Sequence, residues 1–517
     1  MAKRIMIQGT MSGAGKSLIC AALCRIFRQD GFRTAPFKSQ NMALNSFVTR
    51  DGGEMGRAQV LQAQAAGKEP DVRMNPILLK PSGDMDSQVI VSGRVYGNYS
   101  AAEYFKMKKD LIPEILSAYE SLASENDIIV IEGAGSPAEI NLKKDDIVNM
   151  GLAEMVGSPV ILAGNIDPGG VFAQLYGTMA LLEERERERI IGTLINRFRG
   201  DEAILRPGLS MLEDLTKVPV LGVIPYMDLD LDDEDSLSPR FTKTENERAV
   251  DIAAIRLPHI SNFTDLAPLE AHPALGVRYV NRADRLGDPD MIILPGSKNT
   301  IGDLLWLRET GLYDLIRQKA EEGTPLLGIC GGYQMLCGSI SDPAGTEHEG
   351  EAEGLGLLPG RTVFSEEKIQ KQSNAVVQAS PFRRERISGY QIHMGRTIVK
   401  DPEFFREQET SFSKTEVPGS FRRNGAAPFC IMEDGTPDGC VCGSVFGTYL
   451  HGLFDSGELV GRLACYLSER KGIDCPAYDP ESHMARQEKE LDRLADVVRE
   501  HIDLEMIYRA MEEYDNG

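Results

Sequence analysis

The sequence predicts an α/β protein whose first half is a doubly wound parallel sheet and whose second half is a further α/β domain. Two observations predict this fold. Short apolar runs alternate with helical stretches along much of the chain, and such runs are typical of parallel strands that helices cover on both faces. A glycine-rich turn also follows an apolar run once in each half, near residues 9 and 330. At about 100–200 residues per domain, the 517 residues correspond to two to four domains.

The first domain is expected to span residues 1–227. A strand at 5–8 enters the first glycine-rich turn, and a helix follows at 16–28. Further apolar strands are expected at 128–132, 160–163, 190–195 and 220–224. This alternation predicts the doubly wound arrangement.

An acidic segment, residues 228–249, separates the two halves and is expected to be a solvated linker. After it, apolar strands are expected at 252–255, 277–280, 291–294 and 326–329. They define a second α/β domain, residues 250–460. Residues 461–517 are charged, with apolar residues at helical spacing, and predict a C-terminal helical extension that packs on the outside.

Charge and composition exclude several classes of partner. The net charge of −22 argues against nucleic acid, because phosphate binding requires a basic surface. No apolar run approaches the ~18 residues that a membrane span needs, and the N-terminus lacks the pattern of a signal peptide. The nine cysteines form no paired framework, which predicts reduced thiols. We therefore expect a cytoplasmic protein that acts on small molecules.

The first glycine-rich turn has the features of a phosphate-binding loop. It runs from Gly9 through Gly13 and Gly15 to Lys16 and Ser17, between a strand and a helix. Glycines let backbone N–H groups converge on phosphate oxygens, and the helix N-terminus favours negative charge. Lys16 is expected to reach the β- and γ-phosphates of ATP, and Ser17 to ligate Mg²⁺. The loop is one residue longer between Gly9 and Gly15 than the usual motif.

Three carboxylates are candidates for the same metal ion. Glu132 ends an apolar strand, so it is expected at the sheet edge beside the phosphate loop, where it can hold Mg²⁺ directly or through water. Asp51 and Glu54 are weaker candidates. They follow a polar stretch, 38–41, that could face the phosphates or the acceptor substrate.

The second glycine-rich turn is the sharpest signal in the chain. An apolar strand runs into Gly328-Ile329-Cys330-Gly331-Gly332 and then a helix, which is the cysteine version of a nucleophile elbow. Glycines on both sides permit the strained turn that lifts Cys330 above the sheet, and the helix N-terminus stabilises its thiolate. Backbone N–H groups at the turn can form part of an oxyanion hole.

A thiolate nucleophile also needs a base. His451 ends the apolar strand expected at 445–450, which would bring its imidazole to the same sheet edge as Cys330. His393 is the competing candidate and ranks second.

The second half resembles the class I glutamine amidotransferases, whose motif Gly-[Ile/Val]-Cys-x-Gly-x-Gln ends here at Gln334. The resemblance implies an oxyanion hole formed by the loop 294–297, which contains Gly296, together with Gly331. Most members place a glutamate two residues after the histidine, but His451 is followed by Gly452 and Leu453. The group that orients His451 is therefore open, with Asp455 close by in sequence.

The first half resembles the dethiobiotin-synthetase-like branch of phosphate-loop proteins. That resemblance implies phosphorylation of a carboxylate and adenine contacts from Asn196 and Tyr226. The combination of both halves resembles the cobyrinate-amidating enzymes of corrinoid biosynthesis. The segments that carry this resemblance are 9–17, 36–42, 51–57, 75–81, 132–142, 196–201, 389–396 and 447–452.

The resemblance implies ATP- and glutamine-dependent amidation of the b, d, e and g side chains of adenosylcobyrinic acid a,c-diamide. Three alternatives remain at this point. One is the family member that makes the a,c-diamide itself, with the same chemistry at other side chains. The second is a nucleotide-switched scaffold with a decayed glutaminase, against which the intact Cys330 turn argues. The third is a stand-alone glutaminase whose first half only senses ATP.

Overall fold

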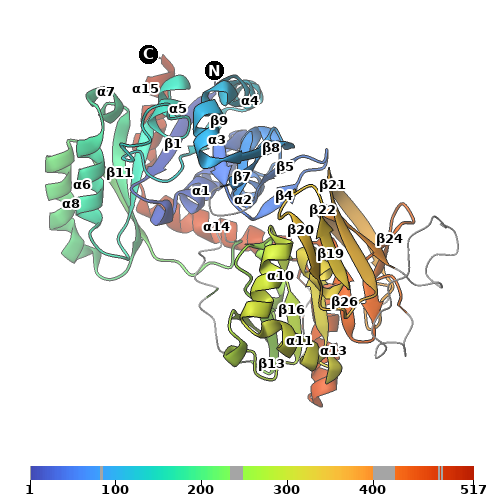
Figure 1. The fold of residues 1–517 in the computed structure, drawn as a ribbon. Helices are drawn as coiled ribbons and strands as arrows, with labels where there is room; N and C mark the ends of the chain where they lie inside the picture. The colour runs from blue at the N-terminus through green and yellow to red at the C-terminus, as the bar shows by residue number, and fades with distance from the viewer. Residues whose placement is uncertain are drawn as a thin grey trace.

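The computed structural model describes residues 2–81, 86–232, 241, 248–382, 384–399, 426–475, 478 and 481–516. The chain forms two lobes (Figure 1). A six-stranded parallel sheet lies at the centre of the first lobe, which confirms every strand predicted there. In spatial order its strands are β12 (Val220–Pro225), β11 (Ile190–Phe198), β10 (Val160–Asn165), β1 (Lys3–Gly9), β9 (Ile128–Glu132) and β2 (Thr34–Phe37).

Helices cover both faces of this sheet. Successive side chains of each strand point to opposite sides, so a continuous apolar strand gives the sheet two apolar faces. Met6 of β1 faces one apolar core, whereas Ile5 and Ile7 face the other. The helices packed in the Met6 core include α4 (Ile112–Glu125), α5 (Met150–Met155), α6 (Val171–Leu181) and α8 (Glu202–Thr216). The opposite core is covered by α1 (Lys16–Gln29), α2 (Arg57–Ala65), α14 (His483–His501) and α15 (Leu504–Asn516). The end of the chain thus packs on the first lobe.

A smaller sheet and a two-stranded sheet extend the first lobe towards the second. The smaller sheet contains β3 (Gln40–Met42), β6 (Ile77–Pro81), β7 (Asp86–Val91) and β8 (Arg94–Ser100). Two short helices of the first lobe lie outside these sheets in the chain order, α3 (Ala101–Met107) after β8 and α7 (Glu184–Arg187) before β11. The two-stranded sheet pairs β4 (Ser46–Val48) with β5 (Glu54–Gly56). Tyr390 of the second lobe donates a hydrogen bond of 3.1 Å to the Ser46 carbonyl, so β4 lies at the contact between the lobes.

The second lobe contains its own mainly parallel sheet, as predicted. Only its edge strand β25 is antiparallel to its neighbour. The strands in order are β15 (Leu275–Val280), β13 (Val250–Ile255), β16 (Met291–Leu294), β18 (Leu326–Ile329), β26 (Val445–Thr448) and β25 (Cys440–Cys442). The helices of this lobe are α9 (Ala267–Ala271), α10 (Thr300–Glu309), α11 (Leu312–Glu321), α12 (Gly331–Leu336) and α13 (Gly457–Lys471).

The sequence pattern did not predict the second sheet of this lobe. A long antiparallel pair, β21 (Gly360–Val377) and β22 (Arg386–Val399), forms its centre and lies beside β4 (Figure 1). The remaining strands of the sheet are β19 (Ser339–Asp342), β20 (Gly350–Glu353), β23 (Cys430–Met432), β24 (Pro437–Asp438) and β27 (Leu450–His451). A separate short pair joins β14 (Ile260–Ser261) to β17 (Gly296–Ser297).

Two expectations from the sequence were wrong in part. Asp232, in the expected solvated linker, has a side chain only 7% exposed, because it forms ion pairs with His483 at 3.0 Å and Arg57 at 3.5 Å. The linker residues 233–240 and 242–247 lie outside the described residues. Cys465 and Cys475 are joined in a disulfide rather than being free thiols.

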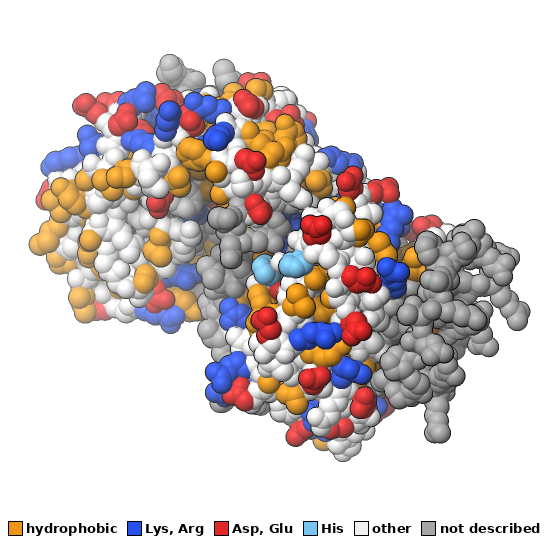
Figure 2. Space-filling model, in the orientation of Figure 1, with side chains coloured by type: hydrophobic (Ala, Val, Ile, Leu, Met, Phe, Trp, Pro, Cys, Tyr) orange, Lys and Arg blue, Asp and Glu red, His pale blue; other side chains and the backbone are white. Residues whose placement is uncertain are grey.

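The visible surface carries mixed charge. Among the coloured side chains in Figure 2, acidic and basic groups alternate over both lobes. In the described part of the chain, no helix is both long and apolar enough to cross a bilayer.

Candidate functional site

Cys330 lies in a sharp turn between β18 and α12. Its backbone has φ +52° and ψ −107°, which non-glycine residues rarely adopt. The neighbouring glycines allow this turn by packing directly on backbone. A Cβ on Gly332 would lie 1.9 Å from the carbonyl oxygen of Leu294, and one on Gly328 would lie 2.6 Å from the nitrogen of Tyr333. The turn has the geometry that a nucleophile elbow requires.

His451 and Asp265 lie next to Cys330. Cys330 and His451 line the same pocket, and the Cys330 thiol donates to the Ile392 carbonyl at 3.6 Å. The Nδ1 atom of His451 lies 2.7 Å from a carboxylate oxygen of Asp265. The other carboxylate oxygen accepts a hydrogen bond of 2.9 Å from the N–H of Gly452. Asp265 therefore holds the position that the sequence left open. It precedes His451 by 186 residues, and no local pattern marked it.

Electrostatics favour a protonated His451. Burial lowers the pKa of His451, but the Asp265 carboxylate that is hydrogen-bonded to its imidazole outweighs burial and raises this pKa to about 10. The imidazolium can therefore carry a proton in the pocket that Cys330 lines. The three side chains thus have the arrangement of a cysteine nucleophile, its proton carrier and an orienting carboxylate.

The two other candidates for these roles are placed differently. The Nδ1 atom of His393 lies 2.7 Å from the carbonyl oxygen of Gly395, and its ring stacks on Tyr449 with centroids 3.8 Å apart. Burial lowers the pKa of His393 to about 4, so the ring is neutral near pH 7. Asp455 lies close to Gly452, and burial raises the pKa of Asp455 to about 6. Asp265, not Asp455, contacts the imidazole of His451.

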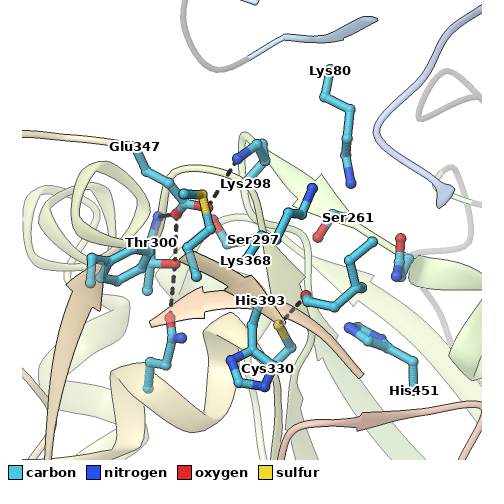
Figure 3. A pocket seen from close by; sticks show the side chains of 15 residues that line it. Lys80, Ser261, Ser297, Lys298, Thr300, Cys330, Glu347, Lys368, His393 and His451 are labelled. Atoms are coloured by element: carbon cyan, nitrogen blue, oxygen red, sulfur yellow. Dashed lines mark hydrogen bonds and ion pairs between the residues drawn. The ribbon is translucent and has the colours of Figure 1, made fainter. Parts of the chain in front are cut away.

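The expected oxyanion and glutamine-binding residues surround the same turn. A Cβ on Gly331 would lie 2.8 Å from the Ser297 nitrogen, and one on Gly296 would lie 3.4 Å from the Cε1 atom of His451. The backbones of β17 and of the Cys330 turn are thus in contact. Gln334 is buried and lines a pocket together with Cys330 and His451. Lys298, Thr300, Glu347, His393 and Lys80 also line this pocket (Figure 3).

The phosphate loop lies in the first lobe at the carboxyl end of β1. Lys16 donates hydrogen bonds to the carbonyl oxygens of Met11 at 3.1 Å and Gly135 at 3.1 Å, so its ammonium lies over the loop. Ser17 donates to the Glu132 carboxylate at 2.8 Å. The structure therefore brings together the loop lysine, the loop serine and the strand-end carboxylate that the sequence singled out.

Glu132 is the centre of a buried polar cluster that sequence reasoning found only in part. Its side chain is 1% exposed and pairs with Lys38 at 2.9 Å. Gln59 and Gln62 of α2 donate to its other oxygen at 3.2 and 2.5 Å. A hydroxyl and a carboxylate are ligands that Mg²⁺ accepts when phosphate oxygens complete its shell. Within the described ranges, no group of three or more His, Cys, Asp or Glu side chains forms a self-contained metal site.

The weaker metal candidates make other contacts. The Glu54 carboxylate is fully buried between Lys80 of the first lobe, at 2.9 Å, and Lys368 of the second, at 2.5 Å. The Asp51 carboxylate accepts a hydrogen bond from Thr49 in a turn. The hydrogen bonds of Glu54 connect the lobes, and those of neither residue involve Ser17 or Glu132.

Of the two residues expected near adenine, Asn196 contacts the loop, whereas Tyr226 follows β12 at the edge of the sheet. Asn196 donates to the Ala14 carbonyl at 3.0 Å and packs against Gly15. Tyr226 is 39% exposed, and the Arg199 guanidinium lies 3.4 Å from its ring centroid. A flat, partly exposed ring at this edge can stack on a base.

Known families match both lobes. The CobQ/CobB/MinD/ParA nucleotide binding domain matches residues 5–239, and the CobB/CobQ-like glutamine amidotransferase domain matches residues 251–459. Each match contains one of the sites described above.

Curated relatives match the chain from end to end. The cobyric acid synthase of Ruminiclostridium cellulolyticum is 53% identical, over 100% of this chain and 99% of the relative. The cobyric acid synthase of Lachnoclostridium phytofermentans is 51% identical, over 99% of this chain and 100% of the relative. The cobyric acid synthase of a Thermoanaerobacter species is 50% identical, over 99% of this chain and 100% of the relative. The similarity therefore extends over both lobes.

Proposed function

Given that the chain belongs to the cobyric acid synthase family, we propose that it converts the b, d, e and g carboxylates of adenosylcobyrinic acid a,c-diamide into amides and yields adenosylcobyric acid. Glutamine supplies the nitrogen and ATP activates the carboxylate, with Mg²⁺ as the metal ion. The observation that carries this proposal is that one chain holds both sites. The Lys16–Ser17–Glu132 group suits nucleotide chemistry, and the Cys330–His451–Asp265 group suits amide hydrolysis.

The second lobe releases ammonia from glutamine. The Cys330 thiolate attacks the side-chain amide, while N–H groups at Gly331 and at 296–297 stabilise the oxyanion. His451 holds the proton because Asp265 raises the pKa of His451 to about 10, and it transfers that proton to the leaving ammonia. The same imidazole then takes a proton from the water that hydrolyses the thioester.

The first lobe activates the acceptor carboxylate. Lys16 and the N–H groups of the loop hold the phosphates of ATP, and Ser17 with Glu132 would hold Mg²⁺, which neutralises charge on the transferred group. The substrate carboxylate attacks the γ-phosphorus of ATP, which forms an acyl phosphate and releases ADP. Ammonia then attacks the acyl carbon, phosphate departs, and the product is the amide. Activation is needed because ammonia does not attack a free carboxylate.

Product masses test the substrate assignment. The protein is incubated with ATP, Mg²⁺, glutamine and either adenosylcobyrinic acid a,c-diamide or cobyrinic acid. We expect four amide-for-acid replacements on the a,c-diamide, and no product when EDTA removes Mg²⁺. Amidation of cobyrinic acid at only two carboxylates would favour the a,c-diamide synthase instead. Absence of any amidation by a folded protein that binds ATP would favour the nucleotide-switched scaffold.

Replacing Asp265 with asparagine should slow glutamine hydrolysis by roughly 10²–10⁴-fold, by analogy with the orienting carboxylate of serine proteases. Without the carboxylate, burial still lowers the pKa of His451, so the imidazole loses its proton at lower pH. The alkaline limit of kcat/KM should therefore move to lower pH than in the wild type, as a pH profile of glutamate release would record.

Asp455→Asn is the matched control, because Asp455 is a half-buried carboxylate near Gly452, whereas the carboxylate at the imidazole is that of Asp265. It should slow glutamate release less than about tenfold. Equal losses in the two variants, with an unchanged pH profile for Asp265→Asn, would contradict the orienting role of Asp265.

A further inference from the structure

The pocket at Cys330 contains a buried ion pair that the chemistry at sulfur does not use. Lys298 and Glu347 lie 3.2 Å apart, with side chains 6% and 9% exposed, and both line the pocket. Figure 3 shows this pair on one side of the pocket and His451 on the other. A buried ion pair adds little to stability, because the cost of desolvation offsets the attraction. Stability alone therefore does not explain why the pair lies in this pocket.

Both charged side chains extend from well-anchored backbone. Lys298 directly follows β17, and its N–H donates to the His259 carbonyl at 3.0 Å. The N–H of Glu347 donates to the Asp342 carboxylate at 2.8 Å. The Glu347 carboxylate also accepts from the Thr300 hydroxyl at 3.3 Å. The positions of the two charges are thus fixed before any ligand binds.

The pair retains hydrogen-bonding capacity, in contrast to the other buried cluster at this pocket. Among the described residues, the Lys298 ammonium has one acceptor, Glu347, although it carries three protons. Lys80 and Lys368, which pair with Glu54, each donate to two acceptors. The Lys298 ammonium therefore retains more free protons than they do, and it can bind an anionic ligand.

The pair also lies close to the nucleophile's turn. A Cβ on Gly331, the residue after Cys330, would lie 3.2 Å from the Thr300 hydroxyl. That hydroxyl is 3.3 Å from Glu347. These two successive contacts connect the turn to the Glu347 carboxylate through one side chain, Thr300.

We propose that Lys298 and Glu347 recognise the α-carbon of glutamine, an inference that rests on the glutaminase function proposed above. The Lys298 ammonium binds the α-carboxylate, and the Glu347 carboxylate binds the α-ammonium. Glutamine carries both charges on one carbon, so each ionic contact within the pair is replaced by a contact with substrate and no buried charge is left unpaired. The side chain of the bound glutamine then extends to Cys330.

Three amides test the proposal through ammonia release. Glutamine has both α-groups, 4-aminobutanamide lacks the carboxylate, and glutaric acid monoamide lacks the ammonium. Lys298→Met should lower kcat/KM for glutamine about tenfold or more, mainly through KM, but leave 4-aminobutanamide within about twofold of wild type. Glu347→Gln should show the reverse selectivity, with glutamine impaired and glutaric acid monoamide within about twofold.

Lys471→Met is the matched control, because Lys471 forms an ion pair with Asp290 in the same lobe but outside the pocket. It should leave kcat/KM for all three amides unchanged. Thermal unfolding checks that each variant is folded, and Lys298→Arg keeps the charge if Lys298→Met does not fold.

Equal loss for all three amides in a folded variant would overturn this inference alone, because it would indicate a structural role. Unchanged KM for glutamine in both pocket variants would also overturn it. A wild-type protein that released no ammonia from glutamine would overturn the proposed function as well, and so distinguishes the two failures.

Discussion

Replacing Cys330 with alanine is expected to lower glutamine-dependent amidation by about 10⁴-fold or more. The variant lacks the sulfur nucleophile, and no neighbouring side chain can attack the glutamine amide in its place. Amidation with free ammonium should continue at the wild-type rate. The reason is spatial, because Cys330 lies in the second lobe, whereas Lys16, Ser17 and Glu132 lie in the first. Product formation with each nitrogen source measures both effects.

Cys337→Ala is the matched control for this variant. Cys337 is also buried in the second lobe, but its thiol contacts the Tyr333 carbonyl and does not line the pocket. It should retain amidation with glutamine and with ammonium. Loss of both activities in a folded Cys330→Ala protein would contradict the division of labour between the lobes.

Lys16→Ala has the second large expected effect. It should reduce amidation with either nitrogen source by roughly 10²–10³-fold, because the charge that holds the transferred phosphate is lost. Glutamate release should persist, since the Cys330 pocket contains no group from the phosphate loop. ATP consumption and glutamate release are measured on the same samples.

Lys106→Ala provides the comparison, because Lys106 is an exposed lysine of the first lobe at the end of α3. That variant should amidate normally. Normal amidation by Lys16→Ala would instead mean that the loop does not bind the transferred phosphate.

Local patterns predicted much of the fold. The inner strands of the two main sheets were found because each is a continuous apolar run, whereas the edge strands β2 and β25 were missed. The long strands β21 and β22 were missed. Buried and exposed residues follow one another irregularly along both strands, and many residues are exposed. The alternation of apolar and polar residues that marks a strand is therefore weak in these two segments.

The candidate sites were predicted wherever a residue belongs to a glycine-rich turn or ends a strand. Cys330, Ser17 and Glu132 carry such local signals. Asp265 and the Lys80–Glu54–Lys368 cluster carry none, because their partners are distant in sequence. Asp265 meets His451 when the second lobe folds, and Glu54 meets Lys368 when the two lobes pack together. A single sequence gives no period or spacing for contacts of this kind.

The central claim is that nitrogen leaves glutamine at Cys330 and enters the acid that ATP activates in the other lobe. Glutamine with an isotopically labelled side-chain amide tests it directly, with mass spectrometry of the corrinoid product from the wild type and from Cys330→Ala supplied with unlabelled ammonium. We predict labelled amides from the wild type and only unlabelled amides from Cys330→Ala. Label in the product of the alanine variant, or unlabelled product from a wild type given labelled glutamine alone, would contradict the account.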